Sequence, residues 1–444
     1  MTSSLAGTYG PDSKGPPAEI ESKDSLIATI AEELMQKYSF VTIRDNLELR
    51  YYKNGIYMEG AESEIHEYIV KRLGYRLKNR DRVEVIEHIR YRNVVDRSEF
   101  DTEIDLLNVK NGLLDINTGK LREHDPAYLS MSQIPARFNP KARCVRIGRF
   151  LNDVLEREKV PTAVMMFGYM LHRGVEYEKA FLLIGSGSNG KTTLINVIKA
   201  FFGLANCSSE SLHSLVSDRF AAAELHNKYV NVFADLKSDR LPETGPFKML
   251  TSGDIMSAQK KYGERFQFSN FAKMVFAANN PPDTQDGYAY YRRLVVLPFD
   301  RTFDVKTNLL AELTSEEELS GLLNLALAGW KLLRKVGKFP EESVEKIRQE
   351  YQYRANHVKR FVDDECIIDL NDRDCISTTD RIYTAYAEYC EKHRLRKLPL
   401  NTFGSSLHEF GIINERRMKN KQRDTYYVGI KLKADARESN GVLL

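Results

Sequence analysis

Residues 181–193 read FLLIGSGSNGKTT and combine an apolar strand, a glycine-rich turn and the start of a helix. The turn fits the pattern G-x-x-x-x-G-K-[ST], which is typical of loops that cradle a polyphosphate. Glycine lets the backbone turn tightly and point successive N–H groups inward, and the helix that follows adds the positive end of its dipole. The stretch therefore predicts an ATP-binding loop made of Gly185, Ser186, Gly187, Ser188, Asn189, Gly190, Lys191, Thr192 and Thr193.

Two residues of this loop have specific expected roles. Lys191 should reach the β- and γ-phosphates, and the Thr192 hydroxyl should hold Mg²⁺. The next apolar residues recur at helical spacing as far as Gly203, which predicts an amphipathic helix. A glycine-rich turn could fit the pattern by accident, but the strand before it and the helix after it favour the phosphate loop.

The composition is that of a soluble globular protein. The chain has 444 residues, 42% of them hydrophobic and 29% charged, and a net charge of +3, which predicts about two to four domains. No apolar run approaches the ~20 residues that cross a bilayer, and the N-terminus lacks the apolar core of a signal peptide. We therefore expect an intracellular, cytoplasmic protein. The five cysteines form no C-x-x-C pair, which argues against a zinc ribbon or a redox pair.

Hydrophobic periodicity and turn signals divide the chain into five parts. We expect a disordered leader at 1–23, an α+β domain at 24–143, a helical lead-in and α/β ATPase motor at 144–335, a helical linker at 336–369 and a C-terminal domain at 370–444. Within the second part Asp101, Glu103 and Asp105 alternate and could hold a metal ion. A solvated acidic loop is the interpretation we favour, because no matching acidic or histidine site follows.

Hydrolysis of a triphosphate also needs an acid near the metal, a sensor of the γ-phosphate and a cation for the transition state. Asp235 ends an apolar strand, where a carboxylate can hold Mg²⁺. Asn279 ends a second apolar strand and could orient water or sense the γ-phosphate. Arg292 and Arg293 precede a third strand, where an arginine could act on the ATP of a neighbouring subunit.

In this order these residues resemble a superfamily 3 helicase, a branch of the AAA+ ATPases, over residues of about 40–430. Within that superfamily, the closer resemblance is to the helicase part of phage and plasmid primase–helicases and of the related poxvirus-type enzymes. It also rests on the segments FKMLTSGD at 247–254, AQKKYGERF at 258–266, FAANNPP at 276–282 and NVKNGLLD at 108–115. The resemblance implies an AAA+ P-loop core with a parallel sheet and flanking helices, an α+β domain before it and a winged helix after it.

The sequence departs from that family in three ways. The family's second strand often ends in paired acids or a glutamate. Here Asp235 is followed by Leu236 and Lys237, and the next acid is Asp239, so the identity of the general base stays open. Arg292 and Arg293 are adjacent, so it also stays open which of them is the arginine finger, meaning the arginine that acts on the ATP of a neighbouring subunit. The spacing to Phe299 favours Arg293. The primase domain of larger relatives has no counterpart here, and a primase could act as a separate chain.

Lys260, Lys261 and Tyr262 lie between two strand-like pieces, which predicts a hairpin tip. Lysine contacts phosphates, and tyrosine stacks on a base or sugar. The resemblance implies that this hairpin lines a central pore and grips single-stranded DNA. A solvated surface hairpin is the alternative.

The C-terminal domain is predicted to be a winged helix that binds duplex DNA, from two helices followed by a β-hairpin. Basic residues occupy the hairpin tip, namely Lys419, Lys421 and Arg423. Residues 376–433 hold twelve Lys and Arg against six Asp and Glu, which favours DNA over a neutral partner. A winged helix that docks a protein is the alternative.

The leading hypothesis is an ATP-dependent DNA helicase of a virus or mobile element that translocates as a hexameric ring during replication. ATP and Mg²⁺ would be its cofactors, and the resemblance implies 3′-to-5′ movement. The alternative is an ATP-regulated replication initiator or loader that binds DNA without unwinding it. A P-loop kinase ranks last, because it predicts neither an arginine in trans nor a basic winged helix.

Overall fold

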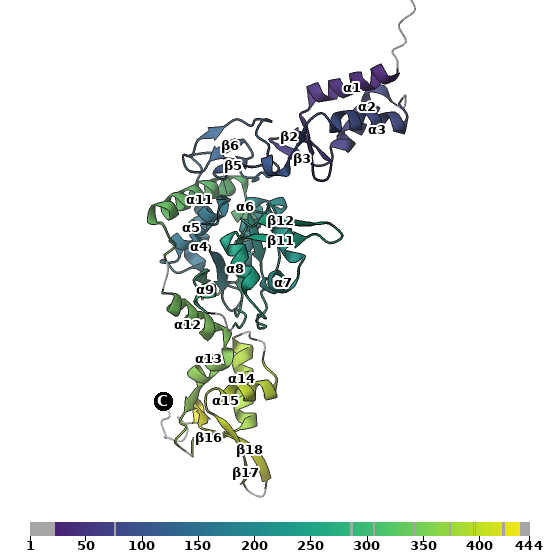
Figure 1. The fold of residues 1–444 in the computed structure, drawn as a ribbon. Coiled ribbons are helices and arrows are strands. Elements are labelled where there is room, and N and C mark those ends of the chain that lie inside the picture. Colours follow the sequence, from purple (N-terminus) through teal and green to yellow (C-terminus); the bar gives the residue numbers. More distant parts are fainter. Residues whose placement is uncertain are drawn as a thin grey trace, which may run out of the picture. The chain divides into compact units, whose positions relative to one another are not determined.

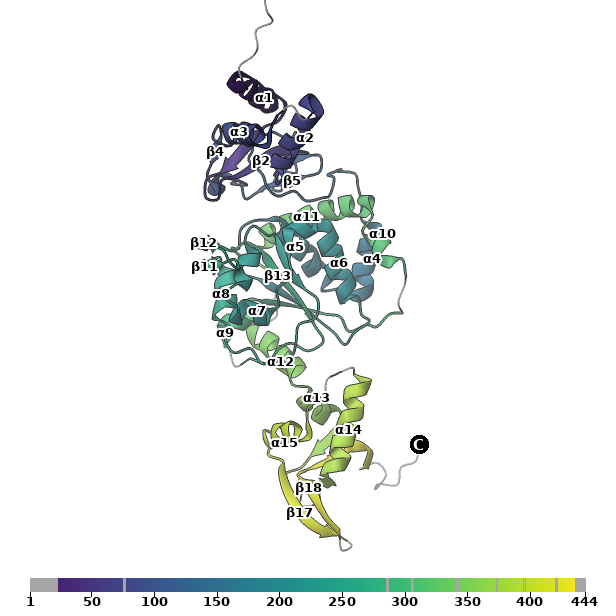
Figure 2. The ribbon, with the colours of Figure 1, turned by 90° about the vertical axis from the view of Figure 1, so that its right-hand side faces the viewer.

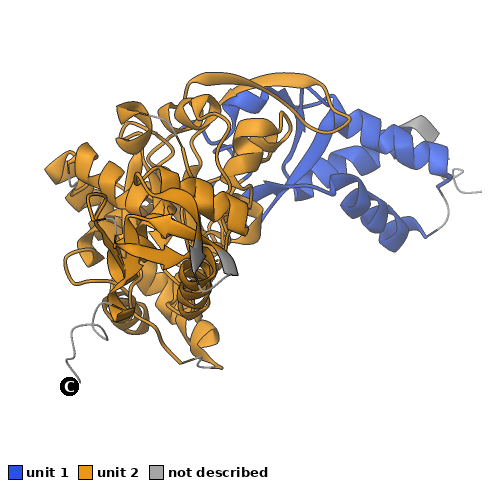
Figure 3. Ribbon diagram, turned by 90° about the horizontal axis from the view of Figure 1, so that it is seen from below, with its two compact units in different colours: residues 1–102, 124–131 blue, residues 103–123, 132–444 orange. Residues whose placement is uncertain are grey.

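The computed structural model describes residues 23–74, 77–284, 287–304, 307–340, 343–372, 374–393, 395, 397–419 and 422–435. The chain divides into two compact units (Figure 3). Unit 1 comprises residues 1–102 and 124–131, and unit 2 comprises residues 103–123 and 132–444.

Unit 1 is a small α+β unit whose sheet has the strand order β3-β2-β1-β4. Its elements are α1 (Lys23–Lys37), β1 (Phe40–Ile43), β2 (Glu48–Lys53), β3 (Ile56–Met58), α2 (Ala61–Leu73), α3 (Asn79–Arg90), β4 (Val94–Val95) and a 3-10 turn at Arg97–Glu99. The turn between β2 and β3 has positive φ at both Asn54 (52°) and Gly55 (90°), as a two-residue hairpin turn requires. The three helices bury a core that includes Ile30, Leu34 and Ile65.

Unit 2 begins with a three-stranded sheet of β5 (Leu106–Val109), β6 (Gly112–Asp115) and β7 (Leu121–Arg122). The sequence analysis assigned this segment to the domain that precedes the motor. Instead Leu107 and Leu114 belong to the same buried cluster as the motor helices. Asn117 Oδ1 also accepts a hydrogen bond from Trp330 Nε1 at 2.9 Å. Residues 103–123 therefore pack as part of the motor unit, because their apolar side chains are buried there.

The motor is built on a five-stranded, wholly parallel sheet with the order β14-β8-β13-β10-β9. Its strands are β8 (Ala180–Ile184), β9 (Cys207–Ser208), β10 (Val230–Phe233), β13 (Lys273–Ala278) and β14 (Leu294–Pro298). Its helices are α4 (Val145–Val154), α5 (Val160–Leu171), α6 (Lys191–Phe202), α7 (Leu212–Ser217), α8 (Gly245–Ser252), α9 (Tyr288–Tyr291), α10 (Leu309–Leu313) and α11 (Glu316–Val336), with 3-10 turns at Leu204–Asn206 and Ala221–Leu225. The expected α/β class is confirmed.

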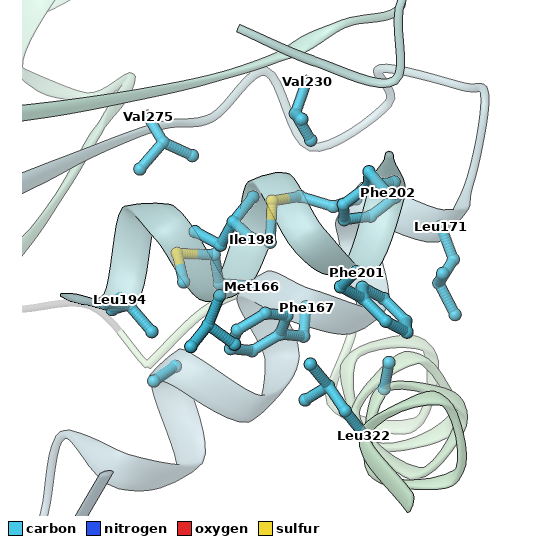
Figure 4. Packing of buried hydrophobic residues seen from close by; sticks show 14 of the residues in the cluster. Met166, Phe167, Leu171, Leu194, Ile198, Phe201, Phe202, Val230, Val275 and Leu322 are labelled. Atoms are coloured by element: carbon cyan, nitrogen blue, oxygen red, sulfur yellow. The ribbon is translucent and has the colours of Figure 1, made fainter. Parts of the chain in front are cut away.

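Helices cover both faces of this sheet, which is why its strands read as continuous apolar runs. Successive residues of β8 alternate between two buried clusters: Phe181 and Leu183 face one, and Leu182 and Ile184 face the other. α4, α5, α6 and α11 lie on the first side, and α7, α8 and α9 lie on the second (Figure 2). Figure 4 shows the first side, where α6 packs between α5 and the strands with Ile198 near its centre.

The crossing of α5 and α11 is unusually close. A Cβ atom on Gly168 would lie 2.2 Å from the backbone nitrogen of Trp330, and one on Gly329 would lie 2.1 Å from the carbonyl oxygen of Val164. No side chain fits at either position, so the two glycines set the distance between the helices. This crossing supports the layer that carries α6 and the loop before it.

Two further helices lead from the motor to the C-terminal part. They are α12 (Val344–Ala355) and α13 (His357–Glu365), and the elements that follow are β15 (Cys366–Ile368), β16 (Ile376–Thr378), α14 (Thr379–Lys392), α15 (Leu400–His408), β17 (Ile413–Lys419), β18 (Gln422–Val428) and β19 (Ile430–Leu432) (Figure 1). α12 contributes Ile347 and Tyr351 to a motor cluster. α13 contributes Phe361 to the C-terminal core, where Tyr386 stacks on Phe403 with ring centroids 4.2 Å apart.

Within the described residues no helix is both long and apolar enough to cross a membrane.

Candidate nucleotide and nucleic-acid sites

The predicted phosphate loop connects the carboxyl end of β8 to the first turn of α6. Gly187, Ser188 and Gly190 have φ values of 102°, 51° and 91°, so the chain makes a left-handed turn before the helix. Lys191 is the first residue of α6, and Thr192 is exposed in the same turn. Backbone N–H groups at a helix start face outward without intrahelical acceptors, so the loop can bind an anion there.

The segment after β14 holds this loop in place. Asn189 Nδ2 donates to the carbonyl oxygen of Phe299 at 2.9 Å, and the backbone nitrogen of Phe303 donates to the Ser188 carbonyl oxygen at 2.8 Å. A Cβ atom on Gly185 would lie 2.1 Å from Asn189 Nδ2 and 2.3 Å from the Phe299 oxygen. Glycine is therefore required at Gly185 by close packing against the end of the neighbouring strand.

Lys191 is buried and its ammonium is surrounded by neutral oxygen atoms. Nζ donates to the carbonyl oxygen of Gly185 at 2.5 Å, to Asn189 Oδ1 at 3.0 Å and to Asn279 Oδ1 at 3.3 Å. Burial lowers the pKa of Lys191 to about 8, and the charge of Asp235 opposes that shift. A buried cation whose hydrogen bonds go to neutral acceptors favours the arrival of an anion.

Asp235 and Asn279 line a common hollow of about 310 Å³ beyond the carboxyl ends of β10 and β13. Asp239 lines it as well, because the chain after Asp235 turns back toward it. Leu236 also lines the hollow, but it is an apolar residue that is only 3% exposed and packs in the motor core, so the position directly after Asp235 supplies no second acid. The hollow thus contains two carboxylates on one loop.

These residues fit a magnesium nucleotide. Among the described residues no group of three or more His, Cys, Asp or Glu is arranged to hold a metal by protein ligands alone. Mg²⁺ is commonly bound through one or two carboxylates together with substrate phosphates. Thr192 and Asp235 supply oxygen atoms of the required kind, and Lys191 supplies a cation for the phosphates.

Arg292 and Arg293 are not brought to this hollow in the same chain. Both precede β14, and the Arg293 carbonyl accepts a hydrogen bond from the Ala180 nitrogen at the start of β8, so they lie at the amino ends of the parallel strands. The length of a five-residue strand, roughly 16 Å, separates that edge from the phosphate loop. Any role of these arginines in hydrolysis requires a second copy of the chain.

The two arginines differ in exposure. The Arg293 side chain is 9% exposed and donates to Ser252 Oγ and to the Ala289 carbonyl, each at 2.7 Å. The Arg292 side chain is 40% exposed and pairs with Glu178 at 2.5 Å. Arg292 is therefore the more solvent-exposed of the two arginines, whereas the sequence spacing favoured Arg293 as the arginine that acts on the ATP of a neighbouring subunit.

The segment from Lys260 to Tyr262 forms the tip of a hairpin made by β11 (Ile255–Gln259) and β12 (Arg265–Ser269), which projects from the motor (Figure 1). Tyr262 is 96% exposed with φ 66°, and Lys261 Nζ lies 5.4 Å from the centre of its ring. The base of the hairpin is anchored by Ala258 and Phe268 in a small apolar cluster. The tip thus presents a cation and an aromatic ring on a fixed stem.

In the C-terminal hairpin, Lys419 pairs in register with Gln422, so Lys419 and Arg423 lie on the strands that flank the tip. Lys421 lies outside the described residues. Thr378 Oγ1 caps α14 by accepting from the Arg381 nitrogen at 3.3 Å. The element order of this part is two helices and then a hairpin, as the sequence analysis expected.

The alternating acids have local partners. Asp101 accepts hydrogen bonds from Ser130 Oγ at 2.6 Å and from the Met131 nitrogen at 3.2 Å. In unit 2, Asp105 contacts His172 Nδ1 at 3.1 Å. Both carboxylates therefore serve local structure.

The sequence analysis missed two arginines beside the candidate nucleotide site. Arg354 and Arg360 lie on α12 and α13, which the sequence analysis treated as a linker. Together with Gly185, Ser186 and Asn279 they line a second hollow, of about 150 Å³. No sequence motif marks them, because only the packing of α12 on the motor brings them there.

Two segments of the chain match known protein families. Residues 183–293 match a family of unknown function (DUF5906), and residues 18–156 match a family described as D5 N terminal like. The chain is 23% identical over 332 residues to a candidate helicase, L207/L206, of Acanthamoeba polyphaga mimivirus. That match covers 66% of this chain and 34% of the mimivirus protein, so the chain spans about a third of the length of this relative.

Among solved structures, the apo C-terminal region of NrS-1 aligns with a TM-score of 0.50 and 12% sequence identity. The alignment covers 90% of this chain and 98% of that one, and it shows a similar fold. Together with the D5-type segment and the mimivirus relative, this alignment makes the chain similar to viral and phage primase–helicases of superfamily 3.

Proposed function

We propose that the chain is an ATP-dependent DNA helicase motor of a virus or mobile element that works as a ring of identical subunits. The observation that carries the proposal is the division of the site between two edges of the sheet. Lys191, Asn279 and Asp235 gather at the carboxyl edge, whereas Arg292 is exposed at the amino edge. A site divided in this way is completed when one copy places its amino edge against the carboxyl edge of the next.

Each residue then has a chemical task. Lys191 and the loop N–H groups bind the polyphosphate, and Thr192 with Asp235 holds Mg²⁺, which neutralises charge on the phosphates. Asn279 orients the attacking water, and Asp235 or Asp239 accepts its proton. Arg292 of the adjacent subunit stabilises the charge of the transition state, and buried Arg293 positions the segment that carries it.

DNA contacts follow from the two hairpins. Six copies would direct Lys260, Lys261 and Tyr262 toward a central single strand, and the tip would move as ATP is hydrolysed. The exposure of Tyr262 and the rigid stem behind it support this assignment. The C-terminal part would be a winged helix that binds duplex DNA, which its helix–helix–hairpin order supports. A separate primase would complete the replication machinery.

The direct test is strand separation on a forked DNA duplex with ATP and Mg²⁺. The wild-type chain should separate the strands, and Lys191→Ala should abolish both separation and ATP hydrolysis. An assembly that hydrolyses ATP and binds duplex tightly, yet never separates strands, would support the initiator or loader instead. Glu345→Ala, on the exposed face of α12, is the control for nonspecific effects of substitution.

A further inference from the structure

Glu178 lies between α5 and β8 with a backbone conformation that is rare for its residue type. Its φ is 51°, in the left-handed region that is unfavourable for any residue with a Cβ atom. Its backbone nitrogen donates to the Val175 carbonyl oxygen at 2.8 Å, which closes a tight turn at 175–178. Such conformations persist where the surrounding structure holds them, and they gather at functional sites. The position therefore points to a role for the side chain of Glu178.

The Glu178 carboxylate contacts both arginines that precede β14. Its Oε2 atom accepts a hydrogen bond from Arg292 Nη2 at 2.5 Å and lies 3.4 Å from Arg293 Nη2. The Arg292 side chain is 40% exposed and that of Arg293 is 9% exposed. One carboxylate oxygen therefore ties an exposed arginine to a buried one.

The backbone around Arg292 is fixed from the same turn. Lys179 Nζ donates to the carbonyl oxygen of Arg292. Val175, at the start of the turn, packs on the end of α8, because a Cβ atom on Gly253 would lie 2.5 Å from Val175 Cγ2. Arg293 Nη2 is bonded to that same helix end. The turn, the end of α8 and the two arginines therefore form one packed assembly at the amino edge of the sheet.

Glu178 does not neutralise this assembly. Lys179, Arg292 and Arg293 carry three positive charges against its one negative charge, which leaves a surplus of two. Within the described residues, Nη2 is the atom through which the Arg292 guanidinium bonds a side chain, so Nε and Nη1 are left for an outside anion. A guanidinium binds phosphate oxygens through two parallel donors, so the orientation of its plane decides whether it can bind.

We propose that Glu178 is a positioning residue for Arg292. It holds Nη2 so that the remaining donors of the guanidinium meet the triphosphate bound by the loop of the adjacent subunit. The proposal rests on the proposed function, from which it takes a site shared between two copies of the chain. Glu178 acts through Arg292 and does not itself contact the nucleotide.

The first test measures steady-state ATP hydrolysis by the full-length assembly after substitution of Glu178. Glu178→Gly removes the carboxylate, and glycine adopts the left-handed backbone readily, so the turn is kept. The kcat should fall about 10- to 100-fold, because Arg292 loses its orientation. The KM for ATP should change by less than about threefold, because the loop that binds ATP belongs to the other subunit. Glu178→Gln, which keeps an oxygen acceptor without the charge, should recover part of the rate.

The matched control is Leu47→Gly. Leu47 also has a positive φ, 52°, and is 43% exposed in unit 1, so the substitution places glycine at a left-handed position without removing a charge. Its hydrolysis rate should equal that of the wild type.

Mixed assemblies assign the effect to one edge of the subunit. Mixing Glu178→Gly with Lys191→Ala should restore part of the ATPase, because some sites then combine an intact loop with an intact amino edge. Mixing Glu178→Gly with Arg292→Ala should give no more activity than the average of the two, because both substitutions damage the amino edge.

The outcomes that overturn the proposal are distinct from failure of the proposed function. A wild-type rate in Glu178→Gly would overturn it, and a raised rate would mean that Glu178 withholds Arg292 from the nucleotide. A lower thermal unfolding temperature with an unchanged rate per assembled ring would leave Glu178 only a structural ion pair. If the proposed function itself fails, the wild type will not hydrolyse ATP, or mixing Arg292→Ala with Lys191→Ala will restore nothing.

Discussion

Lys191 Nζ lies 3.3 Å from Asn279 Oδ1, so a side-chain hydrogen bond joins the phosphate loop after β8 to the end of β13. The two strands are neighbours in the parallel sheet, with Ala278 opposite Ile184. Residues that are 88 positions apart in the chain thus meet where a polyphosphate is expected.

This hydrogen bond predicts that Asn279 affects hydrolysis more than binding. In Asn279→Ala, nucleotide affinity should change by less than about threefold, because Lys191 keeps its hydrogen bonds to Gly185 and Asn189. The hydrolysis rate should fall by about 100-fold, which is typical for loss of a group that positions the reacting atoms. Equilibrium binding of the imido analogue and single-turnover hydrolysis measure the two effects. Equal losses in both would assign Asn279 to binding alone.

Nucleotide affinity should depend on pH through Lys191. Its pKa is about 8 in the empty site, and bound phosphates favour the ammonium, so the pKa rises on binding. Binding then takes up a proton above about pH 8, and affinity should fall by up to about tenfold per pH unit between about pH 8 and 10. Lys191→Arg should bind with little pH dependence, because arginine stays protonated. A wild-type affinity that is flat across this range would contradict the assignment.

Substitutions of Asp235 and Asp239 should differ in how they change the Mg²⁺ dependence of ATP hydrolysis. Asp235→Asn should raise the Mg²⁺ concentration needed for half-maximal hydrolysis, because it removes a metal ligand. Asp239→Asn should leave that concentration unchanged and lower the maximal rate by about 100-fold if Asp239 accepts the proton. Magnesium titrations of ATP hydrolysis test both variants. If Asp239→Asn hydrolysed ATP at the wild-type maximal rate, Asp235 would be the remaining candidate for the general base.

The two adjacent arginines should behave differently in mixed assemblies. Arg292→Ala and Lys191→Ala should each be inactive alone, yet mixing them should restore part of the ATPase, because some sites then combine an intact loop with an intact Arg292. Arg293→Ala should instead lower the free energy of unfolding by about 1–3 kcal/mol, because it removes a buried side chain together with its hydrogen bonds to Ser252 and to the Ala289 carbonyl. Chemical denaturation and mixing experiments distinguish these roles. If each site were instead complete within one chain, mixing Arg292→Ala with Lys191→Ala would restore no ATPase activity.

The hairpin tip should couple hydrolysis to DNA. Tyr262→Ala and Lys261→Ala should abolish unwinding and DNA stimulation while basal hydrolysis remains, since both side chains project into solvent on the far side of the anchored stem. Lys261→Ala should also make single-strand binding less sensitive to salt, by about one released counterion, because one lysine no longer neutralises a phosphate. Normal unwinding by both variants would exclude the tip from the DNA path. Glu264→Ala, also exposed on this hairpin, is the control.

Much of the motor could be predicted from the sequence because its signals are local. A strand buried on both faces reads as an apolar run, and the positive φ values of the turn at 187–190 are a property of its own backbone, for which glycine is the sequence signal. The hairpin turn at Asn54 and Gly55 and the helix cap at Thr378 are likewise set by neighbouring residues. These features depend on interactions between residues that are close in the sequence.

The remaining features depend on which surfaces meet. The sequence placed residues 103–123 with the preceding domain, but the burial of Leu107 and Leu114 among motor helices assigns them to unit 2. Spacing favoured Arg293 as the finger, whereas packing against Ser252 leaves Arg292 as the exposed arginine.

The sequence by itself determined that this chain carries a glycine-rich turn between a buried strand and a helix of an α/β fold, because strand, turn and helix signals there are fixed by local geometry. Only the tertiary structure decided that Arg360 faces that loop. α12 and α13 have no distinguishing pattern, and their position follows from the burial of Tyr351, whose hydroxyl donates to the Pro282 carbonyl at 2.7 Å. That hydrogen bond joins residues 69 positions apart. The position of α12 is therefore stabilised by the burial of apolar side chains from distant parts of the chain, which no short segment of sequence reveals.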